Sequence, residues 1–490
     1  MSRLPYLRLL LGLVLVRPAD AHAQRAPETT ALVGVHVVDV ERGEIVPHQI
    51  VLVRGDRIVR VGPVGTVALP RTARAVRVAG AYVIPGLWDM HVHQQPDPRR
   101  LAEPPRLETA MTLARFQALF IAAGVTGVRD MGGDLEEIEA SQRAIQKEHR
   151  VGPRVVATGH KLGGRPVLPG GPFPVRTTDD VRRSITLLLE RGAHHVKVDP
   201  LPTALTRTAL DECRSRGVPC VSHAPMDMPL TEASDRGVRS VEHLFMFPEN
   251  ASAHGLEQFA QWRSETERPP LWKRVLYKLR LRERPPPVLD RAVSGYDSVK
   301  AAHLFRHLAR NATWVTPTLM LHELLNRLEL LDTLARDEEL MVHRLDPGFR
   351  RELRSVEELA RTRRVQALQF QMVRQMHAAG VGVLAGTDAP LQCAPGFALH
   401  GELALLQRAG LRPIDALRAA TLEPARYLGA TDTLGTVRAG RVADLVVVRR
   451  NPLDDVRHAR EIEMVMIRGR LLTRRQLDSL VAPHRRMPLP

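Results

Sequence analysis

Hydrophobic and polar positions follow two different patterns along the 490-residue chain. Toward the N-terminal end, short apolar runs are separated by polar turns, and Gly55-Asp56 between two of these runs is a hairpin signal. The same pattern returns later, in residues 443–448 and 464–467. The two ends of the chain are rich in strand patterns, and the long middle part has a different pattern. This predicts one small discontinuous β-sandwich domain, built from residues 24–84 and 432–475.

The middle of the chain alternates short β-branched runs with helical patterns. Eight strand candidates cover residues 83–88, 125–129, 154–158, 195–198, 218–222, 239–242, 313–318 and 381–387. Several of the helical patterns end at a glycine, which suits the positive φ at a helix terminus. Eight strands that alternate with helices predict an α/β fold, a (β/α)8 TIM-type barrel over residues 85–431. A doubly wound parallel sheet is the competing architecture.

Two segments stand outside this alternation. Residues 247–311 are too long for one strand-to-helix connection, so we expect an insertion there. The insertion is equally compatible with a lid over one face of the barrel and with a plain surface loop. Residues 476–490 follow the last strand candidate, and we expect them to form a C-terminal tail.

The first 23 residues have the features of a secretory signal peptide. Arg3 and Arg8 precede the apolar run of residues 9–16, and an Ala-His-Ala motif ends at Ala23. We therefore expect cleavage after Ala23 and export to the periplasm or the extracellular space. The apolar run is too short to span a bilayer, so we expect no stable membrane span in the mature chain.

The chain has three cysteines, too few for a disulfide framework. Cys213 and Cys220 are close enough in sequence to pair in an oxidising compartment, although two buried thiols are the favoured interpretation. Cys393 has no evident partner, and none of the three lies in a Cys/His pattern typical of structural zinc.

The charge balance is strongly basic, with 70 Lys and Arg against 54 Asp and Glu and a net charge of +16. Only six of the basic residues are Lys, and the arginines are spread along the chain without a dense basic run. Aromatic residues make up 4%, too few for platforms on which bases stack. We therefore expect no nucleic-acid partner, whereas an anionic surface or acidic groups on a substrate remain compatible with the charge.

Ionisable side chains fall at or just past the ends of five strand candidates. These residues are His91, His93, Lys197, His223, His243 and Asp388. In a barrel, the carboxyl ends of all strands face one side, where active sites are built. His91 and His93 alternate with Val92, so both imidazoles project to one side of an extended chain and are able to bind one cation together. Each signal alone is weak, but the combination predicts a metal centre.

Several motifs together resemble the metal-dependent amidohydrolase superfamily. The motifs are Pro85-Gly86-Leu87-Trp88-Asp89-Met90-His91-Val92-His93, His195-Val196-Lys197-Val198, Val241-Glu242-His243, Gly386-Thr387-Asp388 and residues 400–403, 416–421 and 435–445. The resemblance covers nearly the whole mature chain. The branch that it most resembles is the imidazolonepropionase-like and Xaa-Pro (Xaa-Arg) dipeptidase-like group.

This resemblance implies a centre of two divalent metal ions, most often zinc. It implies that His91, His93 and Asp388 hold the first ion and that His223 and His243 hold the second. Lys197 would bridge both ions after reacting with carbon dioxide to become a carbamate. The ions would depress the pKa of a shared water and so supply hydroxide near neutral pH. Asp388 would accept the proton of this water and deliver it to the departing nitrogen.

The resemblance implies hydrolysis of a C–N amide bond in a small molecule, of the dipeptide or N-acyl amino acid type. The alternatives are a cyclic amide or lactone hydrolase on the same scaffold and a non-catalytic metal-binding or ligand-binding barrel. The chain departs from the family pattern after Lys197, at Asp199-Pro200-Leu201-Pro202, and after His223, at Ala224-Pro225. These departures reshape the substrate side of the site, so the substrate does not follow by analogy. A homo-oligomer is compatible with the sequence, which does not fix the oligomeric state.

Four further residues are candidates for substrate contacts. His160, past the third strand candidate, and Tyr296, in the insertion, are placed where they could touch a substrate, although a structural role is the commoner outcome for such positions. Arg129 and Arg165 are candidates to bind a substrate carboxylate, because a guanidinium group binds a carboxylate through two parallel hydrogen bonds. The sequence does not choose between the two arginines.

Overall fold

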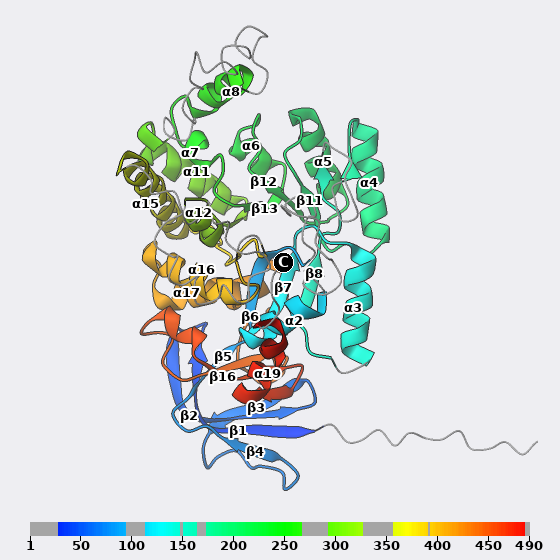
Figure 1. The fold of residues 1–490 in the computed structure, drawn as a ribbon, viewed down its shortest axis with the longest axis vertical. Helices are drawn as coiled ribbons and strands as arrows, with labels where there is room; N and C mark the ends of the chain where they lie inside the picture. Colours follow the sequence, from blue (N-terminus) through cyan, green and yellow to red (C-terminus); the bar gives the residue numbers. More distant parts are fainter. Residues whose placement is uncertain are drawn as a thin grey trace, which may run out of the picture.

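The computed structural model describes residues 28–94, 113–147, 150–163, 173–266, 293–326, 356–390 and 393–485. The expected signal peptide, Arg165 and residues 267–292 of the expected insertion lie outside these ranges. Figure 1 shows a sheet domain at the bottom of the view and an α/β part above it.

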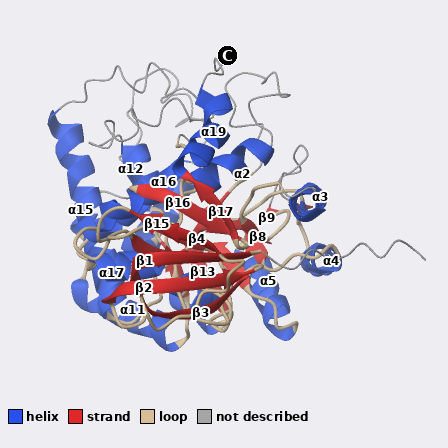
Figure 2. Ribbon diagram, turned by 90° about the horizontal axis from the view of Figure 1, so that it is seen from below, coloured by secondary structure: helices blue, strands red, loops and turns tan. Residues whose placement is uncertain are grey.

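The sheet domain is built from two distant stretches of the chain. Its eight strands are β1 (Thr29–Asp39), β2 (Glu44–Arg54), β3 (Arg57–Pro63), β4 (Arg74–Arg77), β5 (Tyr82–Pro85), β15 (Leu445–Val448), β16 (Ile462–Ile467) and β17 (Arg470–Thr473). They follow the order β17-β16-β15-β5-β1-β2-β3, and β4 also pairs with β1. β5 joins the two stretches, because it pairs with β1 in parallel and with β15 antiparallel. Figure 2 shows this sheet from below.

The two stretches thus form one β-sheet domain, as the sequence predicts. All eight strands belong to a single sheet, whereas the sequence predicts a sandwich of sheets. The sheet is continuous because the first half of β1 pairs with β4 and the second half of β1 pairs with β5. Apolar residues of both stretches, such as Leu32, Val83 and Val447, are fully buried in one cluster of this sheet. This shared core holds the two stretches together.

The α/β part contains two groups of parallel strands. The first group is β6 (Leu87–Val92), β7 (Val125–Asp130) and β8 (Arg154–Ala157), in that order. The second group has the order β10-β9-β11-β12-β13-β14, with β9 (Leu162–Gly163), β10 (Phe173–Pro174), β11 (Val196–Val198), β12 (Cys220–His223), β13 (Val238–Glu242) and β14 (Trp314–Thr316). Every residue of β6, β7 and β11 is buried, which is typical of parallel strands covered on both faces.

Backbone contacts join the two groups on both sides. The N–H of His194 donates to the carbonyl of the last residue of β8 at 2.9 Å, just before β11 begins. On the other side, Val383 forms a bridge with β14 and Ala389 forms one with β6. The sequence predicts a strand over residues 381–387, but the structure has an extended segment with these isolated bridges. A regular ladder with β6 is interrupted because the N–H groups of Trp88 and Ala385 donate to the carbonyls of Ala420 and Ala419, and the segment then turns at Asp388, whose φ is 59°.

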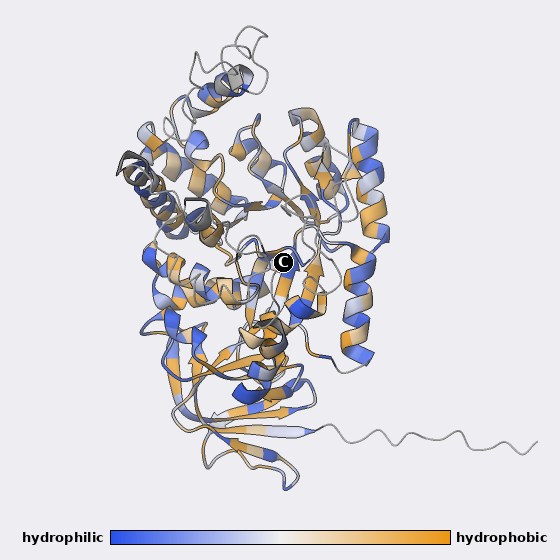
Figure 3. Ribbon diagram, in the orientation of Figure 1, coloured by the Kyte–Doolittle hydropathy of each residue, from blue (hydrophilic) through white to orange (hydrophobic). Residues whose placement is uncertain are grey.

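The helices lie around the outside of the parallel strands (Figure 1). They are α2 (Leu113–Ala122), α3 (Leu135–Lys147), α4 (Thr178–Glu190), α5 (Thr203–Ser215), α6 (Leu230–Asp235), α7 (Phe247–Asn250), α8 (Gly255–Thr266), α11 (Ser298–Arg310), α12 (Leu319–Asn326), α15 (Val356–Ala378), α16 (Phe397–Arg408), α17 (Pro413–Ala419) and α18 (Leu422–Tyr427). In α4, Val181, Ile185 and Leu188 recur at helical spacing and are buried. Figure 3 shows the same division into apolar and hydrophilic faces on the outer helices.

Two expected segments take defined forms. The insertion starts with α7 and α8 and ends in α11. Residues 476–485 of the expected C-terminal tail belong to α19 (Arg474–Arg485), which follows the short helix η3 (Val456–Arg460) and strands β16 and β17. Leu477 and Val481 of α19 are buried in the same apolar core as α2. No helix within the described ranges combines the length and the apolar character that crossing a membrane needs. The three cysteines are buried and none of them forms a disulfide, which agrees with the favoured interpretation.

Candidate metal centre

Three of the expected metal-binding side chains meet at the end of β6. Nε2 of His91 and Nε2 of His93 lie 3.3 Å and 3.1 Å from the same atom, Oδ1 of Asp388. Each of the three residues offers a ligand atom, and these atoms lie within 4.8 Å of one another. The side chain of His91 is 1% exposed and that of His93 is 17% exposed, so only one side of the cluster reaches solvent.

The segment that carries Asp388 is fastened to β6 by hydrogen bonds. The N–H of Asp388 donates to the carbonyl of His91 at 2.8 Å. Thr387 donates to the carboxylate of Asp89 through its hydroxyl, at 2.7 Å, and through its N–H, at 3.1 Å. The preceding position must be Gly386, because a Cβ there would lie 2.8 Å from Cβ of His91. The carboxylate of Asp388 is therefore positioned by protein contacts alone.

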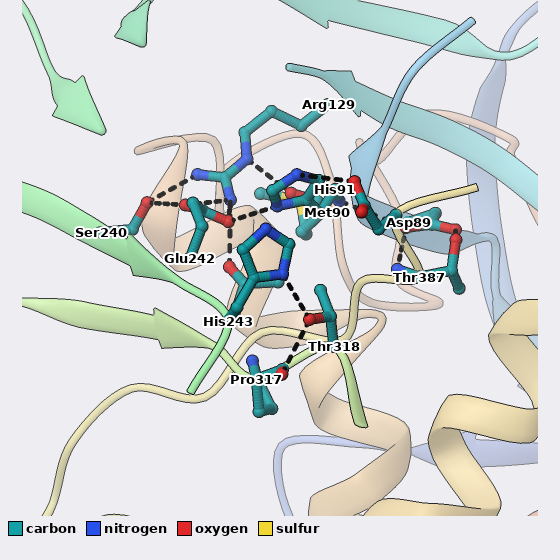
Figure 4. A network of polar contacts seen from close by, with 12 residues as sticks. Asp89, Met90, His91, Arg129, Ser240, Glu242, His243, Pro317, Thr318 and Thr387 are labelled. Carbon is teal, nitrogen blue, oxygen red and sulfur yellow. Dashed lines mark hydrogen bonds and ion pairs between the residues drawn. The ribbon is translucent and has the colours of Figure 1, made fainter. Parts of the chain in front are cut away.

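A buried ion pair fixes the other ring nitrogen of His91. Its Nδ1 lies 2.8 Å from Oε2 of Glu242, and Arg129 donates to both oxygens of this carboxylate at 2.8 and 2.9 Å (Figure 4). The hydroxyl of Ser240 donates a further bond to the same group. Burial alone would raise the pKa of Glu242, but the Arg129 charge and the hydrogen bond from His91 hold it well below its usual range. Glu242 is therefore an anion.

This ion pair decides which nitrogen of His91 is free to bind a cation. A carboxylate only accepts hydrogen bonds, so Nδ1 of His91 carries the hydrogen. In a neutral imidazole, Nε2 then carries a lone pair, and this lone pair faces Oδ1 of Asp388 at 3.3 Å. In the metal-free protein, hydrogen bonds and positive charge from the protonated imidazoles of His91 and His93 outweigh burial and hold the pKa of Asp388 well below its usual range. When both imidazoles are neutral, their lone pairs face an anionic oxygen, and this donor set fits a divalent cation in place of the protons.

His243, directly after β13, is oriented by a neutral group instead. Its Nδ1 lies 2.6 Å from Oγ1 of Thr318, and this hydroxyl donates to the carbonyl of Pro317 at 2.8 Å (Figure 4). Because the hydroxyl hydrogen is committed to Pro317, Nδ1 of His243 is the donor and its Nε2 is left with a lone pair. His243 and Thr318 both have left-handed backbones, with φ of 64° and 46°. Such conformations cost about 1–3 kcal/mol each and concentrate at functional sites.

The remaining two expected ligands lie on β11 and β12. The ring centroid of His223 is 5.0 Å from that of His243, which is 4.7 Å from that of His91. Burial and the nearby charge of Lys197 hold the pKa of His223 well below its usual range, so its imidazole is neutral.

Lys197 is 1% exposed, and its Nζ has no hydrogen-bond partner among the residues that the structure describes. Burial lowers its pKa to about 8, although the nearby carboxylates of Glu242 and Asp199 counteract this shift. A buried ammonium group without an acceptor is unfavourable, so Nζ requires a partner that these side chains do not supply.

The comparison with known protein families agrees with the geometry of this site. The model of the amidohydrolase family matches residues 82–472, which include every residue of the centre described above. The chain belongs to the amidohydrolase family. This confirms the resemblance carried by the sequence motifs, and the protein is an amidohydrolase, an enzyme that hydrolyses amide bonds. No curated protein matches the chain.

Solved structures with a similar fold include three other hydrolases. Bottromycin amidohydrolase has a TM-score of 0.65 and 22% identity, covering 94% of this chain and 91% of its own. A Xaa-Pro dipeptidase with methionine bound in its active site has a TM-score of 0.63 and 17% identity, covering 91% and 100%. Ochratoxinase from A. niger has a TM-score of 0.63 and 18% identity, covering 91% and 96%. At these identities the likeness describes the fold of the amidohydrolase.

The two residues proposed as substrate contacts have other neighbours. The ring of His160 stacks on that of Phe173, with centroids 4.9 Å apart. The hydroxyl of Tyr296 donates to the amide oxygen of Gln375 on α15. Within the described ranges, no hydrogen bond, ion pair or ring contact joins either residue to the six expected metal ligands. Their assignment to the substrate therefore stays a prediction.

Arg129 does not have the role that its sequence position suggested. It is fully buried, and besides Glu242 it donates to the carbonyl of Met90 at 2.7 Å. Its remaining N–H groups donate to the hydroxyls of Ser240, Tyr427 and Thr316. All five N–H groups of this guanidinium are thus used, so Arg129 is unable to bind a substrate carboxylate and that hypothesis is wrong.

Sequence reasoning missed Glu242 and Thr318, which orient two of the histidines. Glu242 stands directly before His243 in one of the family motifs, at the end of the strand Val238–Glu242, and this position next to an expected ligand is the signal that could have found it. Its partner Arg129 is 113 positions away, so no local pattern connects the two. Thr318 follows β14 without any feature that separates it from other threonines.

Proposed function

We propose that this amidohydrolase uses metal ions to hydrolyse the C–N amide bond of dipeptides or N-acyl amino acids at the mouth of a (β/α)8 barrel. The observation that carries the proposal is that ligand atoms of His91, His93 and Asp388 lie within 4.8 Å of one another. Nδ1 of His91 is bound to Glu242, so its Nε2 faces Asp388 and is placed to bind a cation there. Parallel strands joined on both sides by backbone contacts support the closed barrel.

The donor set suits two divalent ions, with zinc as the first candidate. His91, His93 and Asp388 would hold one ion, His223 and His243 the other, and a carboxylated Lys197 both. Neutral imidazoles and anionic oxygens are ligands that Zn²⁺ prefers. Bound ions of this kind lower the pKa of water and polarise a carbonyl, which is the chemistry that amide hydrolysis requires.

Lys197 has the properties that carbamate formation needs. In this reaction its neutral amine nitrogen bonds to the carbon of carbon dioxide, and one proton is released to solvent. Its pKa of about 8 gives a larger neutral fraction at pH 7 than an ordinary lysine has. The product is an anionic oxygen ligand, and its formation removes a buried cation that has no acceptor among the described residues.

Asp388 is the group that we assign to proton transfer. Its low pKa keeps it ionised, so it is able to accept a proton from the attacking water. An amine leaves poorly unless it is protonated, so this proton has to reach the departing nitrogen. The hydrogen bonds from Thr387 to Asp89 fix the position of the neighbouring Asp388 carboxylate, which has to reach both the attacking water and the departing nitrogen.

The names of similar structures support the type of bond, since they include an amidohydrolase and a dipeptidase. We further propose that the protein is exported, on the basis of its first 23 residues. N-terminal sequencing of the protein recovered from the medium or the periplasm tests this, with a start after Ala23 as the expected result. An intact N-terminus on protein retained in the cytoplasm would refute export.

The decisive experiment is metal reconstitution followed by an activity screen. Protein stripped with a chelator is reloaded with Zn²⁺ and assayed near neutral pH on dipeptides, N-acetyl amino acids, cyclic amides and lactones. We expect uptake of about two ions per chain and turnover of the first two classes. Turnover restricted to the last two classes would favour the alternative hydrolase. Absence of both metal uptake and turnover would overturn the proposal.

Asp388→Asn tests the proton-transfer role. We expect kcat to fall by about 10²–10⁴-fold, since the amide is unable to accept the proton. Asp56→Asn, in the exposed hairpin turn of the sheet domain, is the matched control and should leave kcat unchanged. If both variants kept wild-type turnover, another group would have to carry the proton.

A further inference from the structure

Lys161 lies beside the metal centre, although the sequence drew attention to its neighbour His160. The carbonyl of Lys161 accepts the N–H of Phe173 at 2.8 Å, which fixes the backbone just before β9. The ring of His160 stacks on Phe173.

The direction of Lys161 is given by Gly132, in the turn after β7. A Cβ added to Gly132 would lie 2.6 Å from Cε and 3.2 Å from Cγ of Lys161, and 3.4 Å from Nδ1 of His93. The side chain of Lys161 therefore lies across the space that Gly132 leaves open, and His93 borders the same space. Any larger residue at position 132 would block this path.

The charge of Lys161 reaches three expected metal ligands on three different strands. Burial, and after it the Lys161 charge, lowers the pKa of His93. The same charge also acts on His223 and Lys197, whose pKa values burial lowers first. Within the described ranges, no carboxylate or carbonyl is bonded to the ammonium group of Lys161. The half-buried Lys161 thus lies near the centre with ammonium donors that the described residues leave unused.

The turn below Lys161 is fixed by the carboxylate of Asp130, which already accepts three backbone N–H groups. Asp130, at the end of β7, accepts the N–H groups of Gln94, Gly132 and Gly133 at 2.8, 3.1 and 2.6 Å. The side chain of Gln94 is 1% exposed, and neither of its amide atoms has a partner among the residues described. This corner next to His93 therefore holds a cation and a buried amide that the protein itself does not satisfy.

We propose that Lys161 binds the free carboxylate of the substrate and so restricts the enzyme to amides that carry one. A lysine ammonium has three donors and a full charge, which suits a carboxylate oxygen. Dipeptides and N-acyl amino acids have this group next to the scissile bond, whereas their carboxamides and neutral lactones lack it. This inference rests on the proposed function and narrows its substrate class.

The experiment compares free acids with their carboxamides in Lys161→Met, Lys161→Arg and wild-type protein, all loaded with zinc. A panel of dipeptides and N-acetyl amino acids is assayed beside the C-terminal carboxamide of each. For Lys161→Met we expect KM for the acids to rise about 10- to 100-fold, with kcat and metal content little changed. The kcat/KM for the carboxamides should stay at the wild-type value, and Lys161→Arg should recover part of the loss. Lys147→Met, at an exposed position on α3, controls for the loss of a lysine.

The outcomes separate this inference from the proposed function. Equal losses on acids and carboxamides, or no loss on either, would overturn the carboxylate role while wild-type turnover leaves the proposed function standing. If wild-type protein cleaves nothing in the panel, the proposed function fails, and calorimetric binding of N-acetyl amino acids decides the inference. Binding of the acid but not of its carboxamide, lost in Lys161→Met, supports it. Absence of acid binding, or equal binding of acid and carboxamide, refutes it.

Discussion

His91 and His243 are oriented by two different kinds of support. Each has its Nδ1 held by a protein oxygen, which leaves Nε2 with the lone pair. For His91 the oxygen belongs to Glu242, a buried anion paired with Arg129. For His243 it belongs to the neutral hydroxyl of Thr318, which is itself bonded to a backbone carbonyl.

The difference teaches how charge is distributed around the centre. A hydrogen bond to a carboxylate is about twice as strong as one to a neutral acceptor, and it makes the imidazole a better electron donor. It also introduces a second buried anion, Glu242, close to Asp388, and this anion requires Arg129. The hydrogen bond that orients His91 is therefore stronger, but it depends on the intact ion pair between Glu242 and Arg129. The hydrogen bond that orients His243 is weaker and does not depend on a charged group.

Removal of Arg129 should break this comparison most strongly. Arg129→Met leaves the carboxylate of Glu242 buried without its cation, and we expect the free energy of unfolding of the metal-free protein to fall by about 3–5 kcal/mol. Chemical denaturation measures the change. Arg182→Met, which removes an arginine paired with Asp179 on the surface of α4, should change it by at most about 1 kcal/mol. Similar small losses in both variants would mean that the buried pair contributes little.

Glu242→Gln tests the charge of the support rather than its shape. The amide oxygen still accepts from Nδ1 of His91, but the negative charge is gone and Arg129 loses its partner. We expect zinc affinity to fall about 10- to 100-fold, measured by competition with a chromophoric chelator. Ser240→Ala removes one hydrogen bond from the same carboxylate and keeps the charge, so its loss should be smaller. Equal losses would show that the charge is not the decisive property.

Thr318→Val tests the neutral support. Valine keeps the branched shape at this left-handed position and removes the acceptor of His243, so we expect zinc affinity to fall about 2- to 10-fold. The same competition assay applies. Thr318→Ser restores a hydroxyl and should recover most of the affinity. If Val and Ser variants bind zinc equally well, the hydroxyl does not orient His243.

A second buried glutamate shows what a carboxyl group does without an arginine partner. Glu402 of α16 is fully buried and accepts the N–H of Met320 at 2.7 Å, at the start of α12. Burial raises its pKa to about 8. The folded state therefore holds a proton that the unfolded state loses near the ordinary glutamate value, so this group's contribution to stability falls as pH rises from about 4.5 to about 8.

Glu402→Gln should remove this contribution with little other effect. The amide keeps an acceptor for Met320 and has no proton to lose, so the free energy of unfolding should decline less between pH 5 and pH 8 than in the wild type. Chemical denaturation across that pH range measures both slopes. Identical slopes would mean that Glu402 keeps the same charge in both states.

The fold was largely predictable because it depends on local patterns. Alternating β-branched runs placed six of the parallel strands, for example β7 and β13, within two residues of their observed bounds, whereas the candidate over residues 83–88 spans the end of β5 and the start of β6. The segment after Val381 was the other exception, because Trp88 and Ala385 donate to carbonyls at the end of α17 and the segment ends at a left-handed Asp388. The course of the two chain ends through one sheet depends on pairings of β1 that no local pattern encodes.

For the candidate site, the sequence predicted the residues that follow strands but not the groups that support them. Asp388 and His223 were found from their position after a strand. Arg129 was one of two candidates for the substrate carboxylate, because its partners lie far away in sequence and no local pattern shows that its donors are used. His160 was named as a candidate and Lys161 was not, although His160 stacks on Phe173 while Lys161 lies against Gly132 beside His93.

The pairing of β5 with β15 has a consequence for how the protein is made. Tyr82–Pro85 leaves the ribosome more than three hundred residues before Leu445–Val448, so one edge of β5 has no partner for most of translation. An open strand edge invites pairing with other chains, and closing so long a loop slows folding. The early strand β5 thus gains its partner β15 late in synthesis. Until β15 emerges, the open edge of β5 in a nascent chain has to be kept from pairing with other chains.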